Sequence, residues 1–145
     1  MPDNPPVPAG TVAPTLAPML CVRRGPQAVE FYTRAFGAQT LFRMDTEEGT
    51  VVAELAIGES HFWVADESPE HKNFSPETLG GITVRMILVV DDPDSAYQRA
   101  IDAGATVFWP VNDEPYGWRV GRLIDPFGHH WEIGKPLEPA AEAAA

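Results

Sequence analysis

Residues 90–107, VDDPDSAYQRAIDAGATV, describe a helix placed between two strands. Asp92 suits a helix N-cap, because its carboxylate can accept hydrogen bonds from backbone N–H groups of the first turn. Tyr97 and Ile101 recur at helical spacing on one apolar face. Gly104 favours the end of the helix, since glycine readily adopts the left-handed conformation. The stretch therefore predicts an amphipathic helix that connects an incoming strand with an outgoing one.

The first half of the chain repeats this pattern, because residues 22–38 also run from an apolar strand end through an apolar helix face to a glycine. Around each helix, runs of β-prone residues separated by turn residues predict one strand before the helix and three after it. An internal repeat of two βαβββ units indicates that neither unit buries its sheet alone. The predicted strands are 16–22, 39–44, 50–57 and 61–66 in the first unit, and 83–90, 105–110, 118–124 and 129–134 in the second.

The length of 145 residues fits a single domain. We expect this domain to span 15–136, with a first module at about 15–66, a linker at 67–81 and a second module at about 82–135. Residues 1–14 contain five prolines and predict an irregular arm, because proline lacks the backbone donor that helices and strands need. Residues 137–145 predict a flexible tail.

The charge balance argues against polyanionic partners. Ten Lys and Arg residues face 21 Asp and Glu residues, and the formal net charge of −11 would repel nucleic acid and anionic membranes. There is neither a secretory leader pattern nor an apolar run of membrane-spanning length, so a cytoplasmic protein is expected. The single cysteine, Cys21, lies in an apolar run and predicts a small buried hydrophobe rather than a reactive thiol.

Three segments carry a resemblance to a known family: AVEFYTRAFGAQ at 28–39, VDDPDSAYQRAIDAGATV at 90–107 and YGWRVGRLIDPFGHHWEI at 116–133. They resemble the vicinal oxygen chelate (VOC) superfamily of glyoxalase I, bleomycin-resistance proteins and extradiol dioxygenases. The DPFGH-x-W pattern near the end is most similar to the PhnB-like branch. The resemblance implies an α+β fold in which two βαβββ modules form a curled mixed sheet around a cleft. It also implies a homodimer, which we expect because the edge strands of each module invite pairing.

Metal-dependent members of the family take one ligand from the first strand and one from the last strand of each module. The resemblance places these ligands near Ala17, Trp63, Arg85 and Glu132. Only Glu132 has a side chain that binds metals in the usual way, and Arg85 is a permanent cation that would repel a divalent ion. The four-ligand site of the family is therefore not retained, and no cofactor is expected.

Strand alternation predicts which side chains line the cleft, because residues two apart share one face of a strand. One face of each central strand is wholly apolar and would pack on the helices, which leaves the other face for the cleft. The aromatic residues around the predicted flexible lip at 110–117 would add to this surface. The ligand-binding candidates are His61, Trp63, Arg85, Trp109, Tyr116, Trp118, His130 and Glu132.

His61, His130 and Glu132 offer a different arrangement, because two histidines and one carboxylate can hold Fe(II) or another divalent metal. A pair between Arg85 and Glu132 would compete with this metal site for the carboxylate. His129 follows a turn glycine and predicts a structural hydrogen bond or exposure, and Asp125 in the same turn predicts a cap of backbone donors. His71 lies in a loop and is expected to be solvated.

Two functions remain open at this point. The first is a glyoxalase/bleomycin-resistance-like protein whose metal-free cleft binds a small polar aromatic or zwitterionic molecule, with stacking on Trp63 and ion pairing to Arg85. The second is a metal-dependent enzyme of the glyoxalase or dioxygenase type, a lyase or dioxygenase that uses His61, His130 and Glu132. The sequence does not decide whether the protein is an enzyme.

Overall fold

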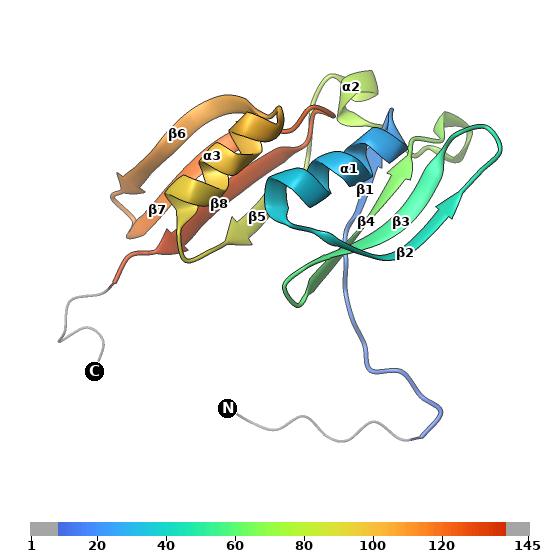
Figure 1. The fold of residues 1–145 in the computed structure, drawn as a ribbon, viewed down its shortest axis with the longest axis horizontal. Coiled ribbons are helices and arrows are strands. Elements are labelled where there is room, and N and C mark those ends of the chain that lie inside the picture. Colours follow the sequence, from blue (N-terminus) through green and yellow to red (C-terminus); the bar gives the residue numbers. More distant parts are fainter. Residues whose placement is uncertain (1–8, 139–145) are drawn as a thin grey trace.

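The computed structural model describes residues 9–138 (Figure 1). Two four-stranded sheets follow one another along the chain, with strand orders β1-β4-β3-β2 and β5-β8-β7-β6, here called sheet 1 and sheet 2. The first module comprises β1 (Met19–Val22), α1 (Gly25–Phe36), β2 (Gln39–Asp45), β3 (Val51–Ile57) and β4 (Ser60–Asp66). The second comprises β5 (Met86–Val89), α3 (Pro93–Ala103), β6 (Thr106–Glu114), β7 (Trp118–Ile124) and β8 (His130–Pro136).

The two modules repeat the same topology. In each, the first strand pairs in parallel with the last, and the other neighbours are antiparallel, so each sheet is mixed. The predicted α+β fold of two βαβββ modules is confirmed, and neither sheet closes into a barrel. Residues 67–81 join the modules and contain the short helices η1 (Pro69–His71) and α2 (Pro76–Leu79).

Helices α1 and α3 lie side by side and cover the same side of the two sheets (Figure 1). Helix α3 begins as the sequence predicts, because the Asp92 carboxylate accepts from Ser95 N at 3.2 Å. The start of α1 is held differently. The Asp66 carboxylate at the end of β4 accepts from Gly25 N at 2.8 Å and from Val51 N at 2.7 Å. A single side chain thus ties the first helix to two strands of its module.

A single apolar core joins the modules beneath the helices, and its centre is aromatic. Tyr32 of α1 packs against Phe62 of sheet 1 and Trp131 of sheet 2, with ring centroids 5.5 Å apart in both pairs. One carboxylate, Asp125, lies inside this core and is 3% exposed. Because the aromatic rings come from both modules, the core itself holds the modules together.

The carboxylate of Asp125 is fully engaged. One oxygen accepts from Tyr32 Oη at 2.5 Å and from Trp131 Nε1 at 3.0 Å, and the other accepts from Phe127 N at 2.9 Å and His129 N at 3.0 Å. The predicted backbone cap is confirmed. The bond from Tyr32 is an addition, since it connects the two modules through a buried acidic group.

Three predicted elements differ from the structure, and one of them is the fifth strand, which begins at Met86 rather than at residue 83. The segment 110–117 is not a flexible lip: β6 continues through Pro110 to Glu114 and leaves only a short turn before β7. Proline is tolerated there because β6 is an edge strand and the register shifts on both sides of Trp109. The first strand begins at Met19 rather than at residue 16. Residues 9–14 contain neither helix nor strand, and the rest of the predicted arm and most of the predicted tail lie outside the described residues.

Candidate functional site

Each sheet has one face packed on the helices and one face turned away from them, here called the open face. The alternation predicted from the sequence is confirmed, since Phe62 and Val64 of β4 are buried, as are Trp131 and Ile133 of β8. Large apolar side chains nevertheless remain exposed on the open faces, and Ile87 of β5 is 64% exposed. Further examples are Met19, Phe42, Met44, Val89 and Trp109. Apolar exposure of this kind marks a surface that receives a ligand or a partner.

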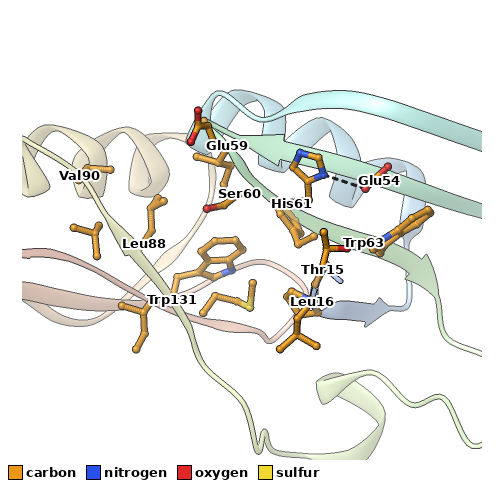
Figure 2. A pocket seen from close by; sticks show the side chains of 18 residues that line it. Thr15, Leu16, Glu54, Glu59, Ser60, His61, Trp63, Leu88, Val90 and Trp131 are labelled. Atoms are coloured by element: carbon orange, nitrogen blue, oxygen red, sulfur yellow. Dashed lines mark hydrogen bonds and ion pairs between the residues drawn. The ribbon is translucent and has the colours of Figure 1, made fainter. Parts of the chain in front are cut away.

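A groove of about 1020 Å³ lies between the modules (Figure 2). Strands β3 and β4 form one wall, β5 forms the other, and residues 15–18 cross its mouth. His61 and Trp63 of β4 line this groove together with Leu88 and Val90 of the second module (Figure 2). The groove is large enough for a drug-sized molecule.

The side chains of the groove wall in sheet 1 have partners of their own. His61 Nδ1 and Glu54 Oε2 lie 3.2 Å apart, and the His61 side chain is about half exposed. Trp63 packs against Phe42 of β2 with ring centroids 6.1 Å apart. This wall therefore offers a flat indole beside a histidine–carboxylate pair.

The open face of sheet 2 holds the charged candidates. Arg85 immediately precedes β5, which pairs with β8, and its Nε donates to the Glu132 carboxylate, so the expected Arg85–Glu132 pair is present. The Arg85 side chain is 48% exposed and that of Glu132 is 20% exposed. Water therefore screens the pair more than it would in a desolvated cleft.

His130 and Arg122 form a second polar contact on the same face. Arg122 of β7 lies opposite Glu132 of β8 in the register, and its Nε donates to His130 Nδ1 at 3.0 Å. The Arg122 guanidinium lies 4.6 Å from the Phe108 ring centroid and 5.5 Å from that of Trp109. Sequence reasoning missed Arg122, although its alternation with the helix-facing Gly121 and Leu123 would have placed it on the open face.

The remaining aromatic candidates lie on β6, on β7 and in the turn between these strands. Trp109 is the register partner of Arg122, and Trp118 pairs with Pro136 at the far end of β7. Tyr116 lies in the turn between β6 and β7 and is 66% exposed. Of these three, Trp109 alone contacts a charged side chain of the open face through its ring, as far as residues 9–138 show.

The structure divides the predicted site residues between the two sheets. His61 and Trp63 line the groove, whereas Arg85, His130 and Glu132 lie on the open face of sheet 2 and are not among its lining residues. Within residues 9–138, no three His, Cys, Asp or Glu side chains are grouped so that they could hold a metal ion. The positions that the family uses for metal also fit poorly, because Ala17 precedes β1 and Arg85 is paired with Glu132. The described residues of one chain thus do not fit a metal centre.

The other candidates of the sequence have structural roles. His129 Nε2 donates to the Cys21 carbonyl oxygen at 2.8 Å and so links the two modules. His71 is largely exposed beside Ser68. Cys21 is partly buried rather than enclosed, which corrects the predicted buried hydrophobe. Even this partial burial raises the pKa of the Cys21 thiol, with a smaller contribution from the negative charge of Glu67, and the thiol is therefore a poor nucleophile near neutral pH.

None of the helices in the described range has both the length and the apolar character needed to cross a bilayer.

Comparison with known proteins agrees with this geometry. The family model described as the Glyoxalase/Bleomycin resistance protein/Dioxygenase superfamily matches residues 14–133. An uncharacterised protein of Mycobacterium bovis is 39% identical over 130 residues, which cover 87% of this chain and 86% of that protein. An uncharacterised protein of Arabidopsis thaliana is 34% identical over 112 residues, which cover 72% of this chain and 67% of that protein.

Solved structures show the same architecture. The X-ray structure of an Arabidopsis thaliana gene product has a TM-score of 0.69 and 30% identity, and the match covers 86% of this chain and 100% of that one. TioX from Micromonospora sp. ML1 has a TM-score of 0.66 and 29% identity over 86% of this chain and 100% of that chain. A glyoxalase/bleomycin resistance protein/dioxygenase from Nocardioides has a TM-score of 0.63 and 25% identity over 91% and 89% of the two chains. The chain therefore belongs to the glyoxalase/bleomycin resistance protein/dioxygenase superfamily.

Proposed function

We propose that this protein binds a small, flat, polar aromatic or zwitterionic molecule in a metal-free cleft. The observation that carries the proposal is the combination of aromatic rings and paired charges on faces that the helices leave open. Trp63 and Trp109 offer rings for stacking, and Arg85 with Glu132 offers a cation and an anion side by side. Ligand sites commonly combine an apolar lining with a few such polar groups that fix orientation.

A homodimer completes this proposal. In a single chain, apolar side chains such as Ile87 and Met44 stay exposed on the open faces, which is costly in water. A second copy related by a twofold axis would cover both faces and create two equivalent clefts. Light scattering at micromolar concentration is expected to give twice the chain mass of 15.8 kDa. A monomer mass would count against the dimer.

The donor chemistry of the candidate ligands supports the proposal that no metal is bound. His130 Nδ1 accepts from Arg122, and the Glu132 carboxylate accepts from Arg85, so both candidate ligands are already engaged. His61 faces Glu54 on the other sheet. A metal site built from His61, His130 and Glu132 would have to break these contacts and bring the two sheets together.

The finer placement within the superfamily is also a proposal. The turn formed by Asp125, Pro126, Phe127 and Gly128, followed by the buried Trp131, supports the PhnB-like branch.

A location in the cytoplasm is proposed because the free Cys21 has no partner cysteine in the sequence.

The test combines metal analysis with a ligand screen on purified protein. Flat aromatic acids, amines and zwitterions are expected to quench tryptophan fluorescence saturably, and Trp63→Ala or Arg85→Met should weaken the binding of those that occupy the cleft. Gln27→Ala on the helix-covered side serves as a control that leaves binding unchanged. Stoichiometric Fe, Ni, Mn or Zn that is lost on His130→Ala would overturn the metal-free proposal and favour the enzyme.

A further inference from the structure

Arg122 lies on the open face of sheet 2 without a carboxylate partner. By contrast, several arginines of this acidic chain have a carboxylate oxygen within 4.0 Å, namely Arg24, Arg43, Arg85 and Arg119. No carboxylate of residues 9–138 approaches Arg122 that closely, although acidic residues outnumber basic ones 21 to 10 in the sequence. Its acidic register partner, Glu132, is bound to Arg85 instead. A guanidinium without its own counterion therefore remains on this face.

The Arg122 side chain is held in place by other contacts. Its guanidinium lies over Phe108 and near Trp109, and its Nε donates to His130 at 3.0 Å. Cation–π contacts of this kind fix the orientation of a guanidinium without neutralising its charge. The terminal nitrogens have no hydrogen-bond acceptor within residues 9–138. Their N–H groups are free to donate two parallel hydrogen bonds to the two oxygens of an anion such as a carboxylate.

His130 adds a donor to the same location. Because its Nδ1 accepts from Arg122, the ring is neutral and carries its proton on Nε2. Burial, together with the positive charge of Arg122, lowers the pKa of His130 and keeps the neutral form at pH 7. The Nε2–H group has no acceptor in the described part of the chain. This part of the open face therefore combines Arg85, Arg122 and a neutral histidine with Glu132, whose carboxylate is already bound to Arg85.

We propose that Arg122 is the specificity-determining residue of the cleft that a second copy would form over the open face of sheet 2, and that it receives an oxyanion of the ligand, such as a carboxylate, phosphonate or sulfonate. This inference rests on the proposed function and narrows the ligand class to anions and zwitterions with a flat apolar body. Phe108 and Trp109 contact the guanidinium and provide the apolar surface beside the charge. The Arg85–Glu132 pair is self-compensated, so it does not need an external anion.

The experiment compares 2-naphthoate with its neutral relative 2-naphthamide on the full chain. Binding is followed by NMR shifts of the tryptophan indole N–H signals, up to roughly 10 mM probe. We expect 2-naphthoate to bind at least about tenfold more tightly than 2-naphthamide, because a hydrogen-bonded charge pair contributes about that factor. Added salt should weaken the binding of 2-naphthoate and leave that of 2-naphthamide unchanged.

Three variants locate the effect. Arg122→Gln should abolish the preference for 2-naphthoate, and Arg122→Lys, which keeps the charge, should retain part of it. Arg43→Gln is the matched control, because Arg43 lies on β2 of the other sheet and is paired with Asp45. Arg43→Gln should leave the preference unchanged. Thermal melts of all variants check that each is folded.

The outcomes separate this inference from the proposed function. An unchanged preference in Arg122→Gln, or equal binding of the two probes by the unaltered protein, would overturn the role of Arg122 and leave small-molecule binding intact. Failure of both probes to bind would also overturn the oxyanion inference. The wider ligand screen then decides independently whether the protein binds flat polar molecules at all.

Discussion

Replacing Tyr32 with Phe tests whether the buried carboxylate of Asp125 ties the modules together. The substitution removes one hydroxyl group and leaves the ring contacts with Phe62 and Trp131 in place. Tyr32 is 0% exposed and Asp125 is 3% exposed, so no solvent molecule at the surface replaces the lost donor. Trp131 Nε1 still donates to the same oxygen at 3.0 Å. The effect therefore reports one hydrogen bond across the module boundary.

The magnitude follows from the type of bond. A hydrogen bond to a charged group stabilises the folded state by about 1.5–3 kcal/mol. For a domain of this size, each kcal/mol corresponds to roughly 3–4 °C, so Tyr32→Phe should lower Tm by about 5–10 °C at pH 7. Calorimetry or circular dichroism measures the Tm. Urea unfolding measures the free energy independently.

The pH dependence provides a second readout. Burial raises the pKa of Asp125, and the bond from Tyr32 opposes this rise. A raised pKa means that this group favours folding at low pH, and that the contribution is lost as the pH rises from the ordinary value of Asp through the raised one. Without Tyr32 the pKa of Asp125 rises further, so the deficit of Tyr32→Phe should be larger at pH 7 than in mild acid.

A matched control makes the prediction decisive. Tyr116→Phe removes the same hydroxyl group from an exposed turn, and it should change Tm by less than about 2 °C. If Tyr32→Phe lowers Tm no more than Tyr116→Phe does, the buried bond does not contribute to stability. The account of the module boundary would then be wrong.

Three further predictions concern other contacts. Gly25→Ala should lower the free energy of unfolding in urea by about 1–3 kcal/mol, because the added β-carbon would overlap a carboxylate oxygen of Asp66. Gly81→Ala is the control and should be nearly neutral, because a β-carbon there meets no atom within 4 Å. Equal effects of the two substitutions would contradict this account. At protein concentrations low enough for a single chain, a double-mutant cycle of Arg85→Met and Glu132→Met should give a coupling of about 0.2–1 kcal/mol, because both side chains are then in contact with water; a value several times larger under these conditions would contradict that exposure. The Cys21 thiol should react with a disulfide reagent more slowly than glutathione at pH 7 and accelerate only at higher pH, since burial raises its pKa; a rate equal to that of glutathione would refute this expectation.

Local spacing in the sequence determined the elements and their faces. The helix after Asp92 needed only a cap, an apolar face and a terminal glycine, all of which act within a few positions. The strand alternation around Trp131 is a property of the backbone, because successive side chains point to opposite faces. The resemblance to the family placed Arg85 and Glu132 on neighbouring strands, and the structure shows the contact between them.

The tertiary structure alone decided the relations between distant segments. Tyr32 and Asp125 lie 93 positions apart, and their bond depends on how the two modules pack, which no local pattern encodes. The continuation of β6 through Pro110 depends on its place at the edge of a sheet, where a missing backbone donor costs nothing. The stacking of Arg122 on Phe108 and Trp109 depends on two register shifts between β6 and β7. Spacing along the chain determines which face of a strand or helix a side chain occupies. Strand register and packing determine which side chains meet, and both depend on the free energy of the whole core.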